Sequence, residues 1–377
     1  MMLDAIDAQT PGFPQSEPST SRIEIDPNGD VDFVLKTANR QQYTWPAEPI
    51  TGAPPAGRRP DPANDREEAK DEYRFRVSSR CLSAASPIWS RTFNGPRRQL
   101  PRNEGARLEV EQHKWDATAV LILLSILHAR SENIPQQVTL DMLTQIAVLV
   151  DYYKCHEATN SVASAWINAL EQDPATRPPV YHGRESVMWL FVAWVFARPE
   201  TFTDLAALAI YMSEGPMERM SLPFPGAFVY AIDNARHKAI EDFLDNTLLL
   251  RDSLIDPAWQ CQAQPDLSAQ CSSMLLGQLV RFLVNHLGMD VFSSNGQPNR
   301  PFYGISAKKL DAAVREGLPH LLWRGPREIM TAEETADEHC LVHRCSLRDM
   351  MRPFVERMKK EIPALSLENF PRHQLAS

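Results

Sequence analysis

Glycine and positive charge are both scarce in this 377-residue sequence, and each shortage excludes a class of protein. Only 15 residues are glycine, so the Gly-rich loops that cradle phosphate groups are not expected. Lys and Arg number 39 against 48 Asp and Glu, which gives a net charge of −9. This balance argues against a general binder of nucleic acid or anionic membrane, because such binding needs a clustered positive surface.

Cysteine and long apolar runs are also scarce. The six cysteines are too few for a disulfide-stapled secreted domain of this size. The first residues include Asp4 and Asp7 but no basic region, so a secretory signal is not expected. The longest unbroken apolar run, 187–197, is well short of the roughly 20 residues of a spanning helix. We therefore expect no membrane segment and an intracellular location, cytoplasmic or nuclear, where thiols stay reduced.

What the sequence does contain indicates a globular protein with two domains. Hydrophobic residues make up 43% and charged residues 23%, as in ordinary globular chains. Residues 1–22 are rich in Pro, Ser and Thr and predict a disordered tail. A first domain is expected over 26–172, interrupted by a Pro-rich insert at 37–72 whose composition favours a disordered loop over a functional one. The Pro-rich stretch that follows predicts a boundary, with a second domain over 180–377.

Hydrophobic periodicity predicts an α+β fold. The first domain has period-2 strands at 30–35, 73–77 and 107–111. Its helices include one that starts at Ser86 and Pro87, and two that Asp116 and Thr139 can cap. Another helix carries Val162, Trp166 and Leu170 at helical spacing. Every periodic segment of the second domain is helical, namely 184–197, 200–213, 226–250, 272–288 and 307–316.

Spaced residues between 75 and 93 resemble the signature of the BTB/POZ domain. The family pattern is Phe-x-Ala/Val-His-Lys-x-x-Leu-x-x-x-Ser-Pro-x-aromatic, and the matching residues here are Phe75, Val77, Leu82, Ser86, Pro87 and Trp89. Ser78 and Ser79 stand where the family has His and Lys, and the insert separates two strands that a tight hairpin usually joins. The resemblance covers 26–172 and is greatest to BTB proteins of filamentous fungi.

The resemblance implies a small mixed sheet packed on a cluster of helices, followed by an all-helical extension. It also implies a non-enzymatic scaffold that forms homodimers and recruits other proteins. The alternative is a substrate adaptor of a cullin-based ubiquitin ligase, which would make a cullin one of the partners. A transcriptional regulator is a further alternative. The expected interaction surface is the exposed part of 79–93, with Asp30, Ile88 and Trp89 as candidate residues.

No catalytic motif accompanies these features. The sequence has no G-x-S-x-G and no H-E-x-x-H, so we expect no enzyme. His128 falls at the end of a predicted helix, where a surface role or an interaction with the helix dipole is the simplest interpretation. Cys81 and Cys155 are interpreted as small core residues.

One group of residues has the chemistry of a metal site. Thiolates and imidazoles are ligands for zinc, and this sequence has such groups at Cys261, Cys271, Cys340, His343 and Cys345. The spacing matches no standard zinc finger, so unrelated thiols are the alternative, and a metal-dependent enzyme is a third hypothesis. If the two groups of residues converge and bind metal, the site is a structural zinc centre that ties the C-terminal segment to the helical domain. Convergence without a metal would leave a disulfide as the alternative, which a reducing compartment disfavours. No other cofactor is expected.

Overall fold

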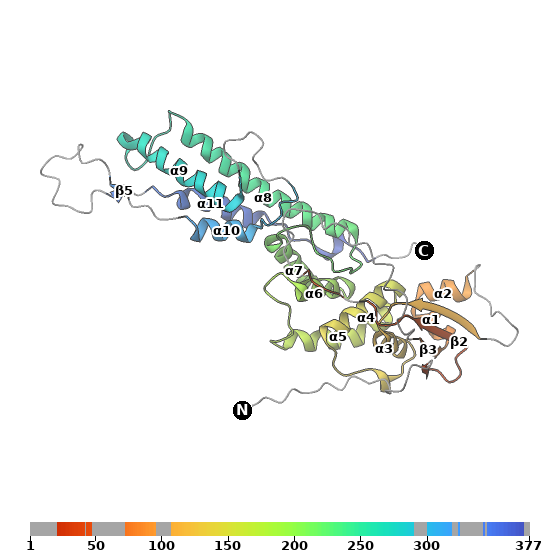
Figure 1. Ribbon diagram of the computed structural model, residues 1–377. Coiled ribbons are helices and arrows are strands. Elements are labelled where there is room, and N and C mark those ends of the chain that lie inside the picture. The colour runs from red at the N-terminus through yellow and green to blue at the C-terminus, as the bar shows by residue number, and fades with distance from the viewer. Residues whose placement is uncertain are drawn as a thin grey trace, which may run out of the picture.

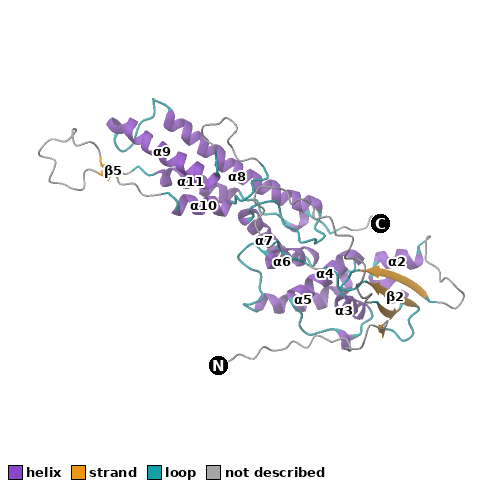
Figure 2. Ribbon diagram, in the orientation of Figure 1, coloured by secondary structure: helices purple, strands orange, loops and turns teal. Residues whose placement is uncertain are grey.

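The computed structural model shows a mixed α+β protein, drawn in Figures 1 and 2. It describes residues 21–41, 43–46, 72–95, 107–289, 300–318, 323–324, 342–343 and 345–372. A four-stranded sheet and its covering helices form one end of the described chain, and a group of long helices forms the other (Figure 1). The expected α+β class is confirmed.

The sheet consists of β1 (Ser21–Glu24), β2 (Val31–Lys36), β3 (Tyr73–Val77) and β4 (Leu108–His113), in the order β1-β3-β2-β4. β2 runs antiparallel to β3 and parallel to β4, and β1 runs parallel to β3. The three predicted strands are therefore confirmed. β1 was not predicted, and it includes residues 21 and 22, which were expected to belong to a disordered tail. Residues 1–20 of that expected tail lie outside the described residues.

Alternation along the strands separates a core face from a charged face. Phe33 pairs with Phe75 across β2 and β3, and both rings are buried, with their centroids 6.1 Å apart. On the other face, Arg76 pairs with Glu24 at 3.2 Å and Arg74 with Glu109 at 2.9 Å. These cross-strand pairs fix the strand register, because a slip of one residue would turn the charged set into the core.

Short capped helices follow β3. Ser78 caps α1 (Ser79–Ala85), and Ser86 caps α2 (Pro87–Asn94), which has Pro87 at its first position. Asp116 caps α3 (Ala117–Leu127) and Thr139 caps α4 (Leu140–Tyr153), as the sequence predicts. α5 (His156–Gln172) completes the expected cluster.

The helices after residue 180 belong to two hydrophobic clusters. α6 (Arg184–Val195) is buried nearly all round and packs between α4 and α7 (Pro199–Met212). The sheet, α3 to α7 and the first part of α8 (Gly226–Ile255) share one core, which extends to Ile232. A second core begins at Ala239. The change from one cluster to the other therefore falls along α8, and α6 packs directly on α4 across the Pro-rich stretch 173–179. The domain boundary at that stretch stays a prediction.

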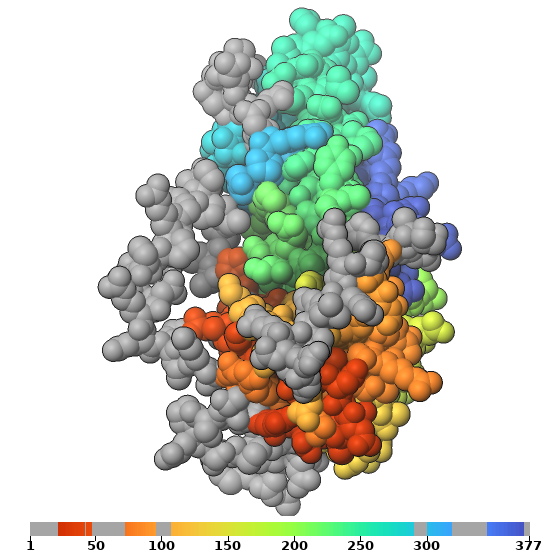
Figure 3. Space-filling model, turned by 90° about the vertical axis from the view of Figure 1, so that its right-hand side faces the viewer, coloured from red at the N-terminus to blue at the C-terminus, as the bar shows by residue number. Residues whose placement is uncertain are grey.

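The second core lies among α8, α9 (Ser268–Leu287), α10 (Ala307–Glu316) and α11 (Leu347–Glu361). A short antiparallel pair, β5 (Trp323–Arg324) with β6 (Val342–His343), precedes α11. Figure 3 shows the sheet and the first helices at one end of the molecule and the green-to-blue helices at the other.

The start of the Pro-rich insert packs against the fold, contrary to the expectation of a disordered loop over 37–72. Tyr43 is only 4% exposed and lies in the first core. Its carbonyl oxygen accepts a hydrogen bond from Arg184 at 3.0 Å, and the Trp45 ring makes an edge contact with His182. The remainder, 47–71, lies outside the described residues.

The C-terminal segment after α11 crosses back to the first core. Trp194 donates its ring N–H to the carbonyl of Phe370 at 2.9 Å, and Thr203 donates to the carbonyl of Leu365 at 3.1 Å. The Phe370 ring packs against Phe228, with the centroids 5.1 Å apart. The chain thus joins the two cores twice, through α8 and through this segment.

One helix has the length and apolar composition of a membrane span. The segment 265–287, which contains α9, has a mean hydropathy of 1.2 over its best window. A single such helix is weak evidence, because core helices of ordinary globular proteins pass the same test. α9 also contributes buried residues such as Leu279 and Phe282 to the second core, so its apolar face already has a partner.

Candidate functional site

Three of the five predicted metal ligands meet at one point. The sulfur atoms of Cys261, Cys271 and Cys345 all lie within 4.8 Å of one another, and those of Cys261 and Cys345 are 3.5 Å apart. Tetrahedral zinc, bound at about 2.3 Å from each thiolate, needs sulfur separations of roughly 3.8 Å. The two groups of cysteines therefore converge as the sequence predicts, and their spacing suits a metal ion.

Local hydrogen bonds hold two of the thiols in place. Cys261 lies in the turn after α8, where its backbone N–H donates to the hydroxyl of Ser268 at 2.9 Å. The N–H of Gln264 donates to the Cys261 sulfur at 3.4 Å. Cys271 lies in the first turn of α9 and is 1% exposed. This short turn therefore positions both thiols on one side of α9.

The third thiol arrives with α11. Cys345 directly precedes Ser346, whose side chain caps this helix by accepting from the N–H of Asp349. Leu347, the first residue of α11, is buried in the second core together with Met351. The packing of α11 on α8, α9 and α10 is thus what brings Cys345 to the other two sulfurs.

The three thiols differ in how easily they ionise. Burial opposes ionisation of Cys261, but hydrogen bonds from the Gln264 N–H and from Cys345 outweigh it and lower the pKa of Cys261. Burial, followed by the charge of its thiol neighbours, raises the pKa of Cys271. Burial also raises the pKa of Cys345. A bound cation would favour ionisation of all three thiols.

The other two predicted ligands are not placed. Cys340 lies outside the described residues. The backbone of His343 belongs to β6 and pairs with Trp323, but its side chain is outside the description. A fourth ligand from this stretch stays a prediction.

The predicted interaction residues have three different environments. Asp30 accepts hydrogen bonds from the N–H of Ser79 at 2.8 Å and from its hydroxyl at 2.6 Å. These bonds outweigh partial burial and lower the pKa of Asp30. Asp30 therefore tethers the start of α1, next to the N-cap residue Ser78.

Trp89 belongs to the core rather than to the surface. It is 2% exposed and stacks on Tyr153, with the ring centroids 4.7 Å apart. The prediction that Trp89 belongs to the interaction surface is therefore wrong, because its ring packs against α4. Ile88 is half-buried. The exposed side of this region consists of Arg80, Ala84, Pro87 and Arg91.

His128 has a structural role that the sequence did not indicate. Its Nε2 atom accepts a hydrogen bond from the N–H of Ser78 at 2.9 Å, and Nδ1 lies 2.7 Å from the carbonyl oxygen of Leu124. Both contacts are satisfied by the neutral ring with its proton on Nδ1. Burial accordingly lowers the pKa of His128. His128 thus joins the end of α3 to the start of α1.

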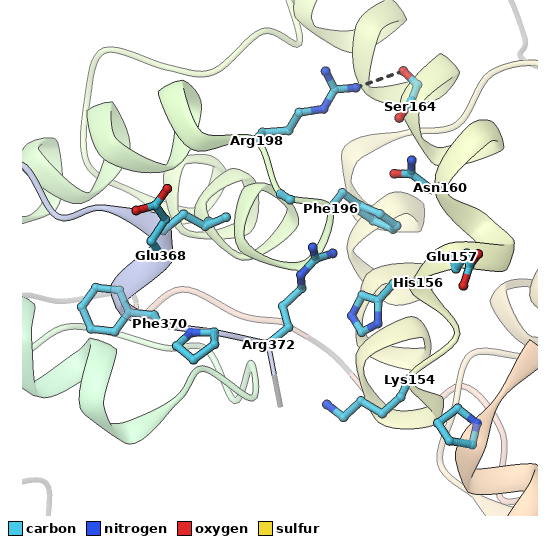
Figure 4. A pocket seen from close by; sticks show the side chains of 14 residues that line it. Lys154, His156, Glu157, Asn160, Ser164, Phe196, Arg198, Glu368, Phe370 and Arg372 are labelled. Carbon is cyan, nitrogen blue, oxygen red and sulfur yellow. Dashed lines mark hydrogen bonds between the residues drawn. The ribbon is translucent and has the colours of Figure 1, made fainter. Parts of the chain in front are cut away.

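A cavity of about 980 Å³ lies where the C-terminal segment meets α5 and the turn between α6 and α7 (Figure 4). Its lining mixes charges of both signs and comes from segments far apart in the sequence: Lys154, His156, Glu157, Arg198, Glu368 and Arg372. Sequence reasoning missed it, because nothing local marks residues that meet only after folding.

The basic groups of this cavity already have partners. Lys154 pairs with Asp151 at 2.6 Å, Arg198 donates to Asn168 at 2.9 Å, and Arg372 donates to the carbonyl of Val195 at 3.0 Å. Burial, helped by the Arg372 charge, lowers the pKa of His156 to about 4. The ring is therefore neutral near pH 7, and its buried Nε2 has no hydrogen-bond partner among the described residues.

Comparison of the chain with protein-family models, with curated proteins and with solved structures finds no match.

Proposed function

We propose that this chain is a non-enzymatic protein–protein interaction scaffold of the BTB/POZ type, which forms homodimers and recruits partner proteins. The observation that carries the proposal is the burial of the side chains on which the resemblance rests. Phe75, Val77 and Leu82 are fully buried, and Ser86 and Trp89 are 1% and 2% exposed. Five of the six matching side chains are thus buried, and the sixth, Pro87, is exposed at the first position of α2. This agreement between the motif and the burial pattern supports a structural signature rather than a chance match.

The order of the elements also supports this proposal. β3 and β2 form an antiparallel pair with β4 on the other side of β2, and α1 and α2 pack against each other. This is the small sheet with a helix cluster that the resemblance implies. The adaptor of a cullin-based ubiquitin ligase remains the alternative, and the transcriptional regulator is a further one.

Self-association is tested by sedimentation of the purified protein at tens of micromolar. We expect a dimer with a two-fold interface that includes the exposed side of α1 and α2. Ala84 and Arg80 are exposed there, so the double change Ala84→Glu, Arg80→Glu is expected to give a monomer. Lys308→Glu, at an exposed position of α10, is the matched control and should leave the dimer intact. A wild-type protein that is monomeric throughout would remove the homodimer from the proposal.

The partner is tested by affinity capture from native extract followed by mass spectrometry, with the Ala84→Glu, Arg80→Glu variant beside the wild type. A cullin captured by the wild type would favour the adaptor, and chromatin proteins would favour the regulator. Partners that both variants capture equally bind elsewhere on the chain.

We also propose that Cys261, Cys271 and Cys345 hold a structural zinc ion, with Cys340 or His343 as the fourth ligand. The convergence of three thiols from two distant segments supports it. Bound zinc would tie the start of α11 to the turn before α9, and the binding free energy of such a site adds to folding.

Elemental analysis tests the zinc proposal. The full-length protein should contain one equivalent of zinc, and the Cys340→Ser, Cys345→Ser variant should lose it and melt at a lower temperature. Separate Cys340→Ser and His343→Asn variants identify the fourth ligand. Cys81→Ser, at a thiol in α1, is the control and should keep its zinc. Equal zinc content in all variants would contradict the proposal.

A further inference from the structure

Two of the three thiols are close enough to be joined by oxidation. The sulfurs of Cys261 and Cys345 are 3.5 Å apart, and a disulfide bond is about 2.05 Å long. The sulfurs therefore have to approach by about 1.5 Å for the bond to form. Cys261 and Cys345 already make a sulfur–sulfur hydrogen bond, so this pair is positioned for a disulfide.

Exposure and hydrogen bonding give the two sulfurs different roles. Cys345 is half-buried, whereas Cys261 and Cys271 are at most 1% exposed, so an oxidant from solvent reaches Cys345 first. The Cys261 sulfur accepts a hydrogen bond from the Gln264 N–H, which holds it beside Cys345. Cys261 is therefore placed, by its distance of 3.5 Å, to attack an oxidised Cys345.

We propose that Cys261 and Cys345 are a redox-sensitive pair, which a peroxide converts into a disulfide. In the first step the Cys345 sulfur attacks one peroxide oxygen, the O–O bond breaks, and a sulfenic acid and one water are formed. In the second step the Cys261 sulfur attacks the Cys345 sulfur, which forms the S–S bond and releases a second water. The two thiols lose two electrons in total, and hydrogen peroxide is reduced to two molecules of water.

The consequence concerns the metal centre and rests on the proposed zinc. A disulfide removes two of the four proposed ligands, so Cys271 and the fourth ligand are left to hold the metal, and oxidation releases it. The disulfide still connects the turn before α9 to the start of α11. In the oxidised protein a disulfide thus replaces the bound metal as the connection between these two segments. Reduction with dithiothreitol restores the thiols.

The experiment treats full-length protein with hydrogen peroxide, once as purified and once after removal of metal by a chelator. Mass spectrometry of a non-reducing digest identifies the crosslinked peptides, and a chromophoric chelator measures released zinc. We expect a Cys261–Cys345 crosslink, the loss of two free thiols per chain, and release of one zinc where zinc was present. Pairing of either residue with Cys340, or sulfinic acid without a crosslink, would overturn the redox proposal.

Variants separate this proposal from the zinc proposal. Cys261→Ser and Cys345→Ser should abolish the crosslink, whereas Cys271→Ser and the control Cys81→Ser should retain it. A Cys261–Cys345 crosslink in a protein that never binds zinc would contradict the metal centre and leave the redox pair standing. Stoichiometric zinc with no crosslink in the stripped protein would contradict the redox pair alone.

Discussion

Replacement of Arg236 by methionine should destabilise this protein more than the loss of any surface charge. Arg236 lies on α8 and has no exposed surface. Its guanidinium donates to four backbone carbonyls, those of Ser213 at 2.8 Å, Pro301 at 2.6 Å, Phe302 at 2.6 Å and Ile305 at 2.7 Å. Burial lowers the pKa of Arg236 to about 10, so the group is still charged near pH 7 and holds the 300–306 turn against the end of α7.

Two opposing effects set the magnitude. Hydrogen bonds to a charged group contribute about 1.5–3 kcal/mol each, so four bonds correspond to a gross loss of roughly 6–12 kcal/mol. Methionine also removes a buried charge, so the variant no longer bears the several kcal/mol that desolvation of this charge costs the folded protein. The difference gives an expected net loss of about 3–5 kcal/mol, the range seen when one partner of a buried ionic contact is deleted. Arg236→Lys should fall between, because an ammonium has only three N–H donors.

Urea unfolding followed by circular dichroism measures the loss, and hydrogen exchange locates it. The N–H of Gly304 donates to the carbonyl of Glu214 at 2.7 Å, so its exchange should accelerate selectively in Arg236→Met. Arg281→Met, the same exchange at an exposed position of α9, is the control and should change stability by no more than about 0.5 kcal/mol. If Arg236→Met were no less stable than Arg281→Met, the carbonyls would not depend on the guanidinium.

Three further predictions concern the first core. Leu82→Asp should unfold the sheet and its helices, because an unpaired buried charge costs several kcal/mol; an unchanged melting temperature would contradict the alignment of 75–93 to the signature. Deletion of 40–70 should lower the melting temperature, whereas deletion of 48–70 should leave it nearly unchanged. The reason is that only the first deletion removes the buried Tyr43. Equal melting temperatures of the two variants would show that Tyr43 packing adds nothing to stability. Stability should fall as the pH drops from about 6.5 towards 4, because burial lowers the pKa of both His156 and His182 to about 4. The unfolded rings then bind protons that the folded rings do not, at a cost of up to about 3 kcal/mol each. His182→Gln should flatten this pH dependence in thermal unfolding, and an unchanged slope would exclude His182 as a contributor.

The elements of the first domain could be read from the sequence because their signals are local. A cap and the N–H that it binds are three residues apart, as for Ser86 and Trp89 or Asp116 and Ala119. Strand periodicity likewise extends over five or six residues. Such signals need no knowledge of distant contacts.

Elements whose signals were short or mixed were missed. β1 has only four residues and pairs with β3 about 50 positions away. α11 was missed over most of its length, although Leu347, Met351, Val355 and Met358 form a buried stripe beside its many charges. Their spacing of four, four and three was a usable helical signal.

The candidate metal centre was partly determined by the sequence. Residue type and rough proximity identified the thiols, since cysteine is the residue whose chemistry suits zinc. Only the tertiary structure decided that Cys261, Cys271 and Cys345 share one point, because helix packing over more than 80 residues of chain brings them together.

The sequence by itself thus determined the α+β class, the starts of the capped helices, and the types of ligand available. Tertiary structure alone decided that Tyr43 packs into the core, that Arg236 is buried among carbonyls, and that Trp89 faces α4 rather than solvent. The physical reason is that capping and periodicity are set by neighbours along the chain. The burial of a tyrosine in a Pro-rich loop, or of an arginine on a helix, depends on contacts with distant segments. No local sequence pattern predicts those contacts.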